Sequence, residues 1–320
     1  MPSAQERSST KIAIIGAGSV GATIAYASMI RGVGNHIVLF DTNRAKVDAE
    51  VLDLVHGLQF VPMARIEGSD DVAICESADV IVITAGAKQK PGQSRMELAE
   101  QNVGICKTLV PELLKASPRA ILLLVTNPVD VITYVTLRLS GLPKNRVLGS
   151  GTVLDSSRFR FLIAKRLKLA VQNVHAYIAG EHGDSEIPLW SSASVANIPL
   201  HEWAVQHHGK LSVVDRTEIF QNVKTAAGQI IAGKGATNYA IGLSTARILE
   251  ALLNDENRVL PVSSLLENYR GISDVCLSVP CIVSRNGVEP PLPIPMNANE
   301  EAGLKNSAET IREAIRKLGF

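Results

Sequence analysis

Residues 11–26 read KIAIIGAGSVGATIAY, and this stretch decides the fold that we expect for the first part of the chain. An apolar run is followed by Gly16, Gly18 and Gly21 in GxGxxG spacing, and then by a helical pattern. These glycines would permit a tight turn, a close approach of a pyrophosphate to the backbone, and close helix packing. Phosphate would bind the free N–H groups at the helix N-terminus. The stretch predicts a dinucleotide site, and an ordinary tight turn is the alternative.

Asp41 ends the next predicted strand, HIVLFD, 20 residues after Gly21. A carboxylate at this place can accept hydrogen bonds from an adenosine ribose, and it would repel a 2′-phosphate. The pattern therefore favours NAD over NADP. A helix-capping aspartate is the alternative interpretation.

Short apolar strands alternate with helices up to about residue 150, which predicts a parallel sheet covered on both faces. The expected fold class is α/β, a doubly wound (Rossmann) parallel sheet followed by a mixed α+β substrate domain. The later part shows a helix over about 155–167, a helical region over about 216–254, and antiparallel strands and turns in VSSLLE, VCLSVPCIVSRNGV and PLPIPM. The expected domains are a flexible arm (1–10), an NAD-binding domain (11–150) and a catalytic domain (151–320), whose helix over about 235–254 packs back near the active site.

Composition excludes several classes of protein. The 320 residues carry a net charge of +1, so a sustained positive field for nucleic acid or a membrane surface is not expected. The first residues, MPSAQERSST, lack the apolar core of a signal peptide. The four cysteines form no CxxC pair and no zinc-spaced cluster with histidine. We therefore expect reduced thiols, no metal site and a cytoplasmic location.

Two motifs after residue 150 carry side chains suited to acid–base chemistry. GEHGDS places His182 between glycines and beside two acids, and histidine can take and give a proton near neutral pH. TVLDSSRFRF places Asp155 and Arg158 three residues apart, on one face of a helix. Asp155 could orient an imidazolium, and Arg158 could clamp a carboxylate through two hydrogen bonds. A plain helix salt bridge is the alternative.

Two further motifs follow predicted strands of the first part. TNPVD places Asn127 at the carboxyl end of a strand, where ligands bind in this architecture, although Asn-Pro is also a common strand-ending turn. GAKQKPGQSR, residues 86–95, has cationic side chains, no anionic one, two glycines and a proline, as expected for a surface loop. We expect this loop to close over a small anionic substrate, with Gln89 helping to select it.

Together, GAGSVG, Asp41, TAGAKQKPGQSR, TNPVD, LDSSRFR, GEHGDS and KGATNYAIG occur in an order and at intervals that resemble the L-lactate/malate dehydrogenases. The resemblance covers nearly the whole chain. It implies hydride transfer between the nicotinamide C4 and the C2 of a 2-oxo or 2-hydroxy acid. The implied roles are His182 as proton donor and acceptor, Asp155 as its orienting partner, Arg158 as ligand of the substrate carboxylate, Arg95 on the mobile loop as the group that polarises the carbonyl, Asn127 as a contact of substrate and nicotinamide, and Thr237 as part of the pocket wall.

The cofactor site that we expect combines the glycine loop with residues around it. Its members are Gly16, Gly18, Val20, Gly21, Asp41, Lys46, Gly86, Ala87, Val125, Thr126, Asn127 and Ser150. A nucleotide-binding structural protein that has lost catalysis is a competing hypothesis. Such a protein would be expected to lack one of His182, Asp155, Arg158 and Arg95, and all four are present.

Gln89 bears on the choice of substrate. In the malate enzymes of the family, an arginine at the matching position pairs with the second carboxylate of oxaloacetate, whereas the lactate enzymes have glutamine. A neutral amide can face a methyl group, but it would leave a buried second carboxylate unpaired, which is costly. We therefore expect interconversion of pyruvate and L-lactate, as in fermentative glycolysis. If Lys88 or Lys90 turned inward, a dicarboxylate could be tolerated, so a dehydrogenase of malate or of another 2-hydroxy acid is the alternative.

Arg160 and His175 suggest a second anion site. Arg160 lies two residues after Arg158, so it points to a different face of the helix. The pair resembles the fructose 1,6-bisphosphate site of allosteric bacterial members of the family, in which two subunits each contribute the pair at a two-fold interface. The resemblance implies a homotetramer activated by this effector. A surface salt bridge and a packed histidine are the alternatives.

Overall fold

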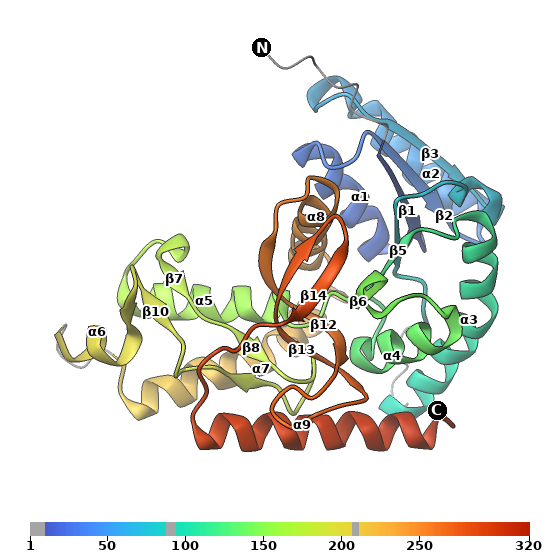
Figure 1. Ribbon diagram of the computed structural model, residues 1–320. Helices are drawn as coiled ribbons and strands as arrows, with labels where there is room; N and C mark the ends of the chain where they lie inside the picture. Colours follow the sequence, from blue (N-terminus) through green and yellow to red (C-terminus); the bar gives the residue numbers. More distant parts are fainter. Residues whose placement is uncertain (1–9, 88–93, 207–210) are drawn as a thin grey trace, which may run out of the picture.

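A computed structural model describes residues 10–87, 94–206 and 211–320, with side chains of 204–206 left out. Within this part, the strands form a nine-stranded sheet in the order β14-β13-β12-β6-β5-β4-β1-β2-β3. The sheet runs through the centre of the molecule, with helices on both sides (Figure 1). The predicted arm at 1–10 lies outside the described residues except for Thr10.

The first six strands are parallel and form the predicted doubly wound sheet. They are β1 (Lys11–Ile15), β2 (His36–Phe40), β3 (Arg65–Ser69), β4 (Val80–Ile83), β5 (Ile121–Leu124) and β6 (Val147–Gly149). The inner strands are continuous apolar runs because both of their faces are covered, and the VIVI residues of β4 are all buried. The prediction of a parallel nucleotide-binding sheet is confirmed.

Four helices connect these strands, and their ends follow from the local sequence. They are α1 (Ser19–Arg31), α2 (Arg44–His56), α3 (Arg95–Ala116) and α4 (Val129–Ser140). Helix α1 ends at Gly32, which has a φ of +64° that favours glycine. Helix α3 begins with a capping box in which Ser94 and Glu97 satisfy each other's backbone N–H groups. Short 3-10 turns lie at Leu58–Phe60, Val72–Cys75, Lys144–Arg146 and Val171–Asn173.

The later part combines helices, small sheets and a long antiparallel hairpin. Its helices are α5 (Val153–Leu167), α6 (Leu200–Gln206), α7 (Val213–Lys234), α8 (Tyr239–Leu253) and α9 (Ala298–Lys317). Short strands form two small sheets: β7 (Val174–His175), β10 (Ser194–Val195) and β11 (Ile198–Pro199) in one, and β8 (Ile178–Ala179) and β9 (Ile187–Pro188) in the other. The hairpin strands are β12 (Arg258–Leu266), β13 (Val275–Ser284) and β14 (Gly287–Pro291).

The structure adds detail to two expectations for the later part. The helical region over 216–254 is two helices, because the chain breaks after Lys234 at Gly235, whose φ is +83°. Of PLPIPM, only Pro291 belongs to a strand, since a proline-rich stretch offers few N–H groups to a ladder. The antiparallel strands also extend the parallel sheet, because Ser263 of β12 pairs with Gly149 of β6.

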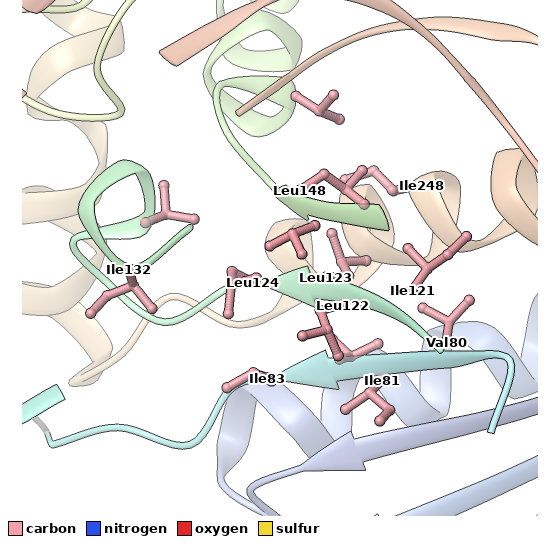
Figure 2. Close-up of a cluster of buried hydrophobic side chains, with 14 of the residues drawn as sticks. Val80, Ile81, Ile83, Ile121, Leu122, Leu123, Leu124, Ile132, Leu148 and Ile248 are labelled. Carbon is pink, nitrogen blue, oxygen red and sulfur yellow. The ribbon is translucent and has the colours of Figure 1, made fainter. Parts of the chain in front are cut away.

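The two parts of the chain therefore share one core. Figure 2 shows Ile248 of α8 beside Leu148 of β6, among the buried aliphatic side chains of β4 and β5. Helix α8 lies along α1 (Figure 1), and Arg31 of α1 donates to the nearly buried carboxylate of Glu250 at 2.6 Å. A smaller core surrounds Phe159, whose ring packs edge-on against that of Trp190, with ring centroids 4.6 Å apart. This packing makes the geometry between the two parts well defined.

Candidate active site

A cleft of about 1800 Å³ opens where the parallel strands end. Its wall includes a residue that follows each of four strands: Gly16 after β1, Asp41 after β2, Thr84 after β4 and Val125 after β5. The carboxyl ends of parallel strands at the switch in strand order are the usual ligand site of doubly wound sheets. Residues of α7 and α8 close the other side, including Ile231 and Ile241.

The glycine loop has the geometry that a pyrophosphate needs. Gly16 has a φ of +101°, and a Cβ there would lie 2.9 Å from the backbone nitrogen of Ala85. A Cβ on Gly21 would lie 1.9 Å from the carbonyl oxygen of Gly16, so only glycine permits this close packing. A Cβ on Gly18 would meet nothing nearer than 3.8 Å, which leaves open space in front of the helix. No side chain caps the N-terminus of α1, so its first N–H groups face this space.

Asp41 is fixed with its charge toward the cleft. Its Oδ2 accepts from the backbone N–H of Ala17 at 2.8 Å, its Oδ1 accepts from that of Asn43 at 3.0 Å, and Lys46 lies 3.5 Å away. Burial alone would raise the pKa of Asp41, but these N–H donors and the lysine outweigh burial and lower it. The N-cap of α2 is Asn43, so Asp41 is not the helix cap that the alternative interpretation required.

The structure brings every other residue of the predicted cofactor set to the same cleft. These are Val20, Lys46, Gly86, Ala87, Val125, Thr126, Asn127 and Ser150. Asn102 of α3 was not predicted, although it links two of them. Its Oδ1 accepts from the N–H of Ala87 and its Nδ2 donates to the carbonyl of Asn127, both at 2.7 Å. A buried asparagine inside an amphipathic helix was the signal that could have revealed it.

His182, Asp155 and Arg158 form one hydrogen-bonded chain at the inner end of the cleft. The Oδ2 of Asp155 lies 2.5 Å from Nδ1 of His182, and its Oδ1 accepts from Nη1 of Arg158 at 2.7 Å. His182 and Arg158 line the cleft, whereas Asp155 lies behind them and is 2% exposed. The helix salt bridge of the alternative interpretation is therefore present, and it leaves the guanidinium facing the cleft.

The charges of His182, Asp155 and Arg158 stabilise one another. The negative charge of Asp155 raises the pKa of His182 to about 9, in spite of the opposing effect of burial. Burial would raise the pKa of Asp155, but His182 and Arg158 outweigh burial and lower it. The raised pKa favours the imidazolium form of His182 at neutral pH, with Nδ1 held by Asp155 and Nε2 free of that contact.

Asn127 and Thr237 also line the cleft, but Arg95 does not. Arg95 is the first residue of α3 and not part of a loop, because the capping box at Ser94 starts the helix there. Its guanidinium pairs with the exposed carboxylate of Asp184 at 2.9 Å. Gln89, Lys88 and Lys90 lie outside the described residues.

Arg160 contacts the segment that carries His175, and neither residue lines the cleft. The Nε of Arg160 donates to the carbonyl of Ala176 at 2.8 Å, and its guanidinium stacks 4.8 Å above the ring of Tyr177. His175 is exposed and adjoins Ala176. The structure therefore places Arg160 against the segment that carries the exposed His175.

Two buried carboxyl groups near His182 were missed. Asp130 accepts from the backbone N–H of His182 at 2.7 Å and from Ser263 Oγ at 2.6 Å, and burial raises its pKa to about 6. Glu186 is 7% exposed, its Oε1 has no hydrogen-bond partner, and burial together with Asp155 raises its pKa to about 8. Asp130 stands in the TNPVD motif and could have been considered, whereas nothing in the sequence pattern points to Glu186.

The described residues contain no group of three or more His, Cys, Asp and Glu placed to hold a metal ion. In the same part of the chain, all four cysteines are free and buried, and burial raises the pKa of each thiol. No helix there has the length and apolar composition to cross a membrane.

A cleft with a glycine loop at one wall and with His182 and Arg158 in its lining is an arrangement that a dehydrogenase of small anionic substrates could use. Comparison with known proteins agrees. Residues 10–149 match the lactate/malate dehydrogenase NAD-binding domain, and residues 152–319 match the α/β C-terminal domain of the same family. The chain belongs to the lactate/malate dehydrogenase family and is an NAD-dependent oxidoreductase.

Similar proteins place the chain with the L-lactate dehydrogenases of that family. The chain is 54% identical to an L-lactate dehydrogenase of Bifidobacterium animalis subsp. lactis, over 97% of this chain and 98% of the relative. It is 51% identical to one of Clostridium botulinum, with the same coverage of both chains. Among solved structures, a minor L-lactate dehydrogenase of Enterococcus mundtii is 39% identical, with a TM-score of 0.93 over 97% of this chain and 98% of that one. A lactate dehydrogenase from a deep-sea metagenome is 38% identical, with a TM-score of 0.93 over 97% and 99%.

Proposed function

We propose that this enzyme interconverts pyruvate and L-lactate with NAD, in the cytoplasm, as a step of fermentative glycolysis. The observation that carries the proposal is the His182–Asp155–Arg158 chain at the inner end of a dinucleotide cleft. A hydride added to a ketone leaves an alkoxide, so a proton donor and a cation must converge on one oxygen. His182 supplies that proton, and Arg158 binds the carboxylate that a 2-oxo acid carries.

NAD supplies the hydride donor or acceptor when it is bound. The glycine loop and Asp41 would hold its pyrophosphate and adenosine ribose, since the open space at Gly18 and the carboxylate of Asp41 fit these groups. The rest of the predicted cofactor set lines the same cleft. We also propose that the chain divides near residue 150 into a cofactor part and a substrate part.

The remaining residues complete the pocket in this proposal. His182 gives the proton from Nε2 because Nδ1 is held by Asp155, and it takes the proton back in lactate oxidation. Arg158 binds the substrate carboxylate through the guanidinium N–H groups that Asp155 leaves free. Asn127 and Thr237 contact the substrate. Arg95 polarises the carbonyl, for which it must leave Asp184.

Gln89 selects pyruvate over oxaloacetate, and initial rates of NADH oxidation with each substrate test this. We expect a strong preference for pyruvate in the wild type. Gln89→Arg should raise oxaloacetate turnover relative to pyruvate by roughly 100-fold or more, since a paired second carboxylate no longer costs binding energy. Gln89→Asn is the matched control that stays neutral. A wild-type preference for oxaloacetate would instead favour the alternative, a malate dehydrogenase in which Lys88 or Lys90 faces the substrate.

We further propose that the enzyme is a homotetramer activated by fructose 1,6-bisphosphate at Arg160 and His175. The support is the contact of Arg160 with the carbonyl of Ala176, the residue after His175, at a place that does not line the cleft. Two such pairs facing each other across a two-fold axis would repel when empty, and a bisphosphate would bridge them. The bisphosphate should lower the half-saturating pyruvate concentration and shift sedimentation toward the tetramer. Arg160→Gln should abolish both effects, and their absence in the wild type would end this proposal.

A further inference from the structure

Asp130 is the buried carboxylate that joins the substrate-facing turn after β5 to the backbone of His182. It lies in the first turn of α4, three residues after Asn127, and it is 1% exposed. Its Oδ2 accepts from the backbone N–H of His182 at 2.7 Å. On the other side of the residue, the ring of His182 is held by Asp155. His182 is thus fixed at both ends by carboxylates from two different helices.

The other oxygen of Asp130 is held from the hairpin of the later part. Its Oδ1 accepts from Ser263 Oγ of β12 at 2.6 Å, and Ser278 Oγ of β13 lies 3.4 Å away. Asp130 therefore cannot rotate away from His182 without leaving a buried hydroxyl unpaired. The helix N-terminus at α4 further favours a negative charge in its first turn. One carboxylate connects the cofactor part, the catalytic histidine and the antiparallel hairpin.

We propose that Asp130 is a positioning residue of the reaction, which holds the backbone of His182 in register with Asn127 across the cleft. The proposal rests on the function proposed above, because it assigns His182 the proton transfer. Asn127 and Asp130 belong to the same turn, so a contact from that turn to His182 sets the distance between the two groups that face the substrate. A displacement of about 1 Å at a reacting group can cost about 100-fold in rate.

The charged groups around Asp130 and His182 determine what a pH titration of His182 would show. Asp130 faces His182, Glu181 and Cys276, and His182 faces Asp155, Asp130 and Glu186. Of these, the Asp130 charge adds to that of Asp155 in stabilising the imidazolium. Removal of the Asp130 charge should therefore lower the pKa of His182, whereas loss of stability alone should not.

Three variants test the proposal. Asp130→Ala removes the acceptor and should lower kcat with saturating pyruvate and NADH by about 10- to 100-fold. Asp130→Asn keeps an acceptor for the His182 N–H and should restore kcat to within about fivefold of wild type. Thr133→Ala is the matched control, since Thr133 is also fully buried in α4 and its hydroxyl donates only within the helix, to Val129 at 2.7 Å. It should keep kcat within about twofold at a similar loss of thermal stability.

A second readout does not depend on turnover. The ring resonance of His182 in histidine-labelled protein should titrate at about 9 in the wild type, and at a pKa lower by roughly half a unit or more in Asp130→Asn. If the resonance titrates alike in both, or if Asp130→Ala and Thr133→Ala lose equal activity, Asp130 is only structural. If Asp130→Ala does not fold, Asp130→Asn decides by its pKa. If the wild type does not reduce pyruvate, the proposed function fails, while the titration still decides the contact.

Discussion

The glycine loop and the His182 cluster are built in opposite ways. The loop and Asp41 come from 26 consecutive residues, 16–41, and its essential features are backbone conformation and the absence of side chains. The cluster draws on α4, α5 and the segment before β9, and its essential features are buried charges that hold one another. The comparison teaches that cofactor binding is a local property of the chain, whereas proton transfer depends on the whole fold. Mutations should therefore separate the two.

The largest effect is expected at His182. His182→Asn should lower kcat/KM for pyruvate by about 100- to 10,000-fold, because the proposed reaction loses its proton donor. The affinity for NADH, measured by quenching or enhancement of its fluorescence, should change by less than about threefold. His201→Asn, at an exposed histidine that does not line the cleft, is the control. An NADH affinity that falls together with turnover would show that the two regions are not separable.

This contrast also explains what the sequence could predict. The strand, the glycine spacing and Asp41 are local, so the parallel sheet and the cofactor cleft followed from pattern alone. The pairing of His182 with Asp155 could be expected only because both stood in recognisable motifs. Glu186 could not be predicted, because its environment is made by α5 and α7, which no spacing brings next to it. The position of Arg95 on Asp184 depends likewise on a contact between residues 89 positions apart.

Glu186 should make the catalytic region sensitive to pH in a way that the loop is not. Its pKa rises from 4.5 to about 8 on folding, so between these values the unfolded chain ionises while the folded one stays neutral. The folded state then binds more protons, and stability falls as pH rises. His182, raised from 6.5 to about 9, acts in the same direction: its contribution is complete below 6.5 and is lost as pH rises through 9.

Glu186→Gln removes one of these two contributions to the fall of stability with rising pH. Relative to wild type, its free energy of unfolding should rise between about pH 5 and pH 8 by on the order of a few kcal/mol. Urea unfolding at several pH values measures the difference. Glu289→Gln makes the same chemical change at an exposed site and should give a constant difference. Parallel stability curves for wild type and Glu186→Gln would mean that Glu186 is ionised in the folded protein.

Two glycines of the same loop should respond differently to one methyl group. Gly21→Ala places a Cβ against the Gly16 carbonyl, so we expect a loss of about 1–3 kcal/mol of stability even without cofactor. Gly18→Ala has space in the protein alone and should leave that stability within about 0.5 kcal/mol. It should nevertheless weaken NADH binding, because the methyl group enters the space in front of α1. Equal stability losses in both variants would contradict the difference in packing between Gly21 and Gly18, and unchanged NADH binding by Gly18→Ala would contradict the assignment of that space to the pyrophosphate.

The smallest effect should come from Asp41, to which we assign the selection between cofactors and no part in the chemistry. Asp41→Ser removes the carboxylate that would repel a 2′-phosphate. It also frees Lys46, which lies 3.5 Å from that carboxylate in the wild type, to pair with the phosphate. The ratio of kcat/KM for NADH to that for NADPH should fall by roughly tenfold, equivalent to about 1.4 kcal/mol. Asp48→Ser removes an exposed carboxylate of the following helix that pairs with Arg44, and it tests the general effect of charge. The KM for pyruvate should stay unchanged in both variants, since the ribose end of the cleft and His182 are separate regions. An equal change of the ratio in Asp48→Ser would mean that the net charge of this surface, and not the placement of Asp41 in the cleft, sets the preference.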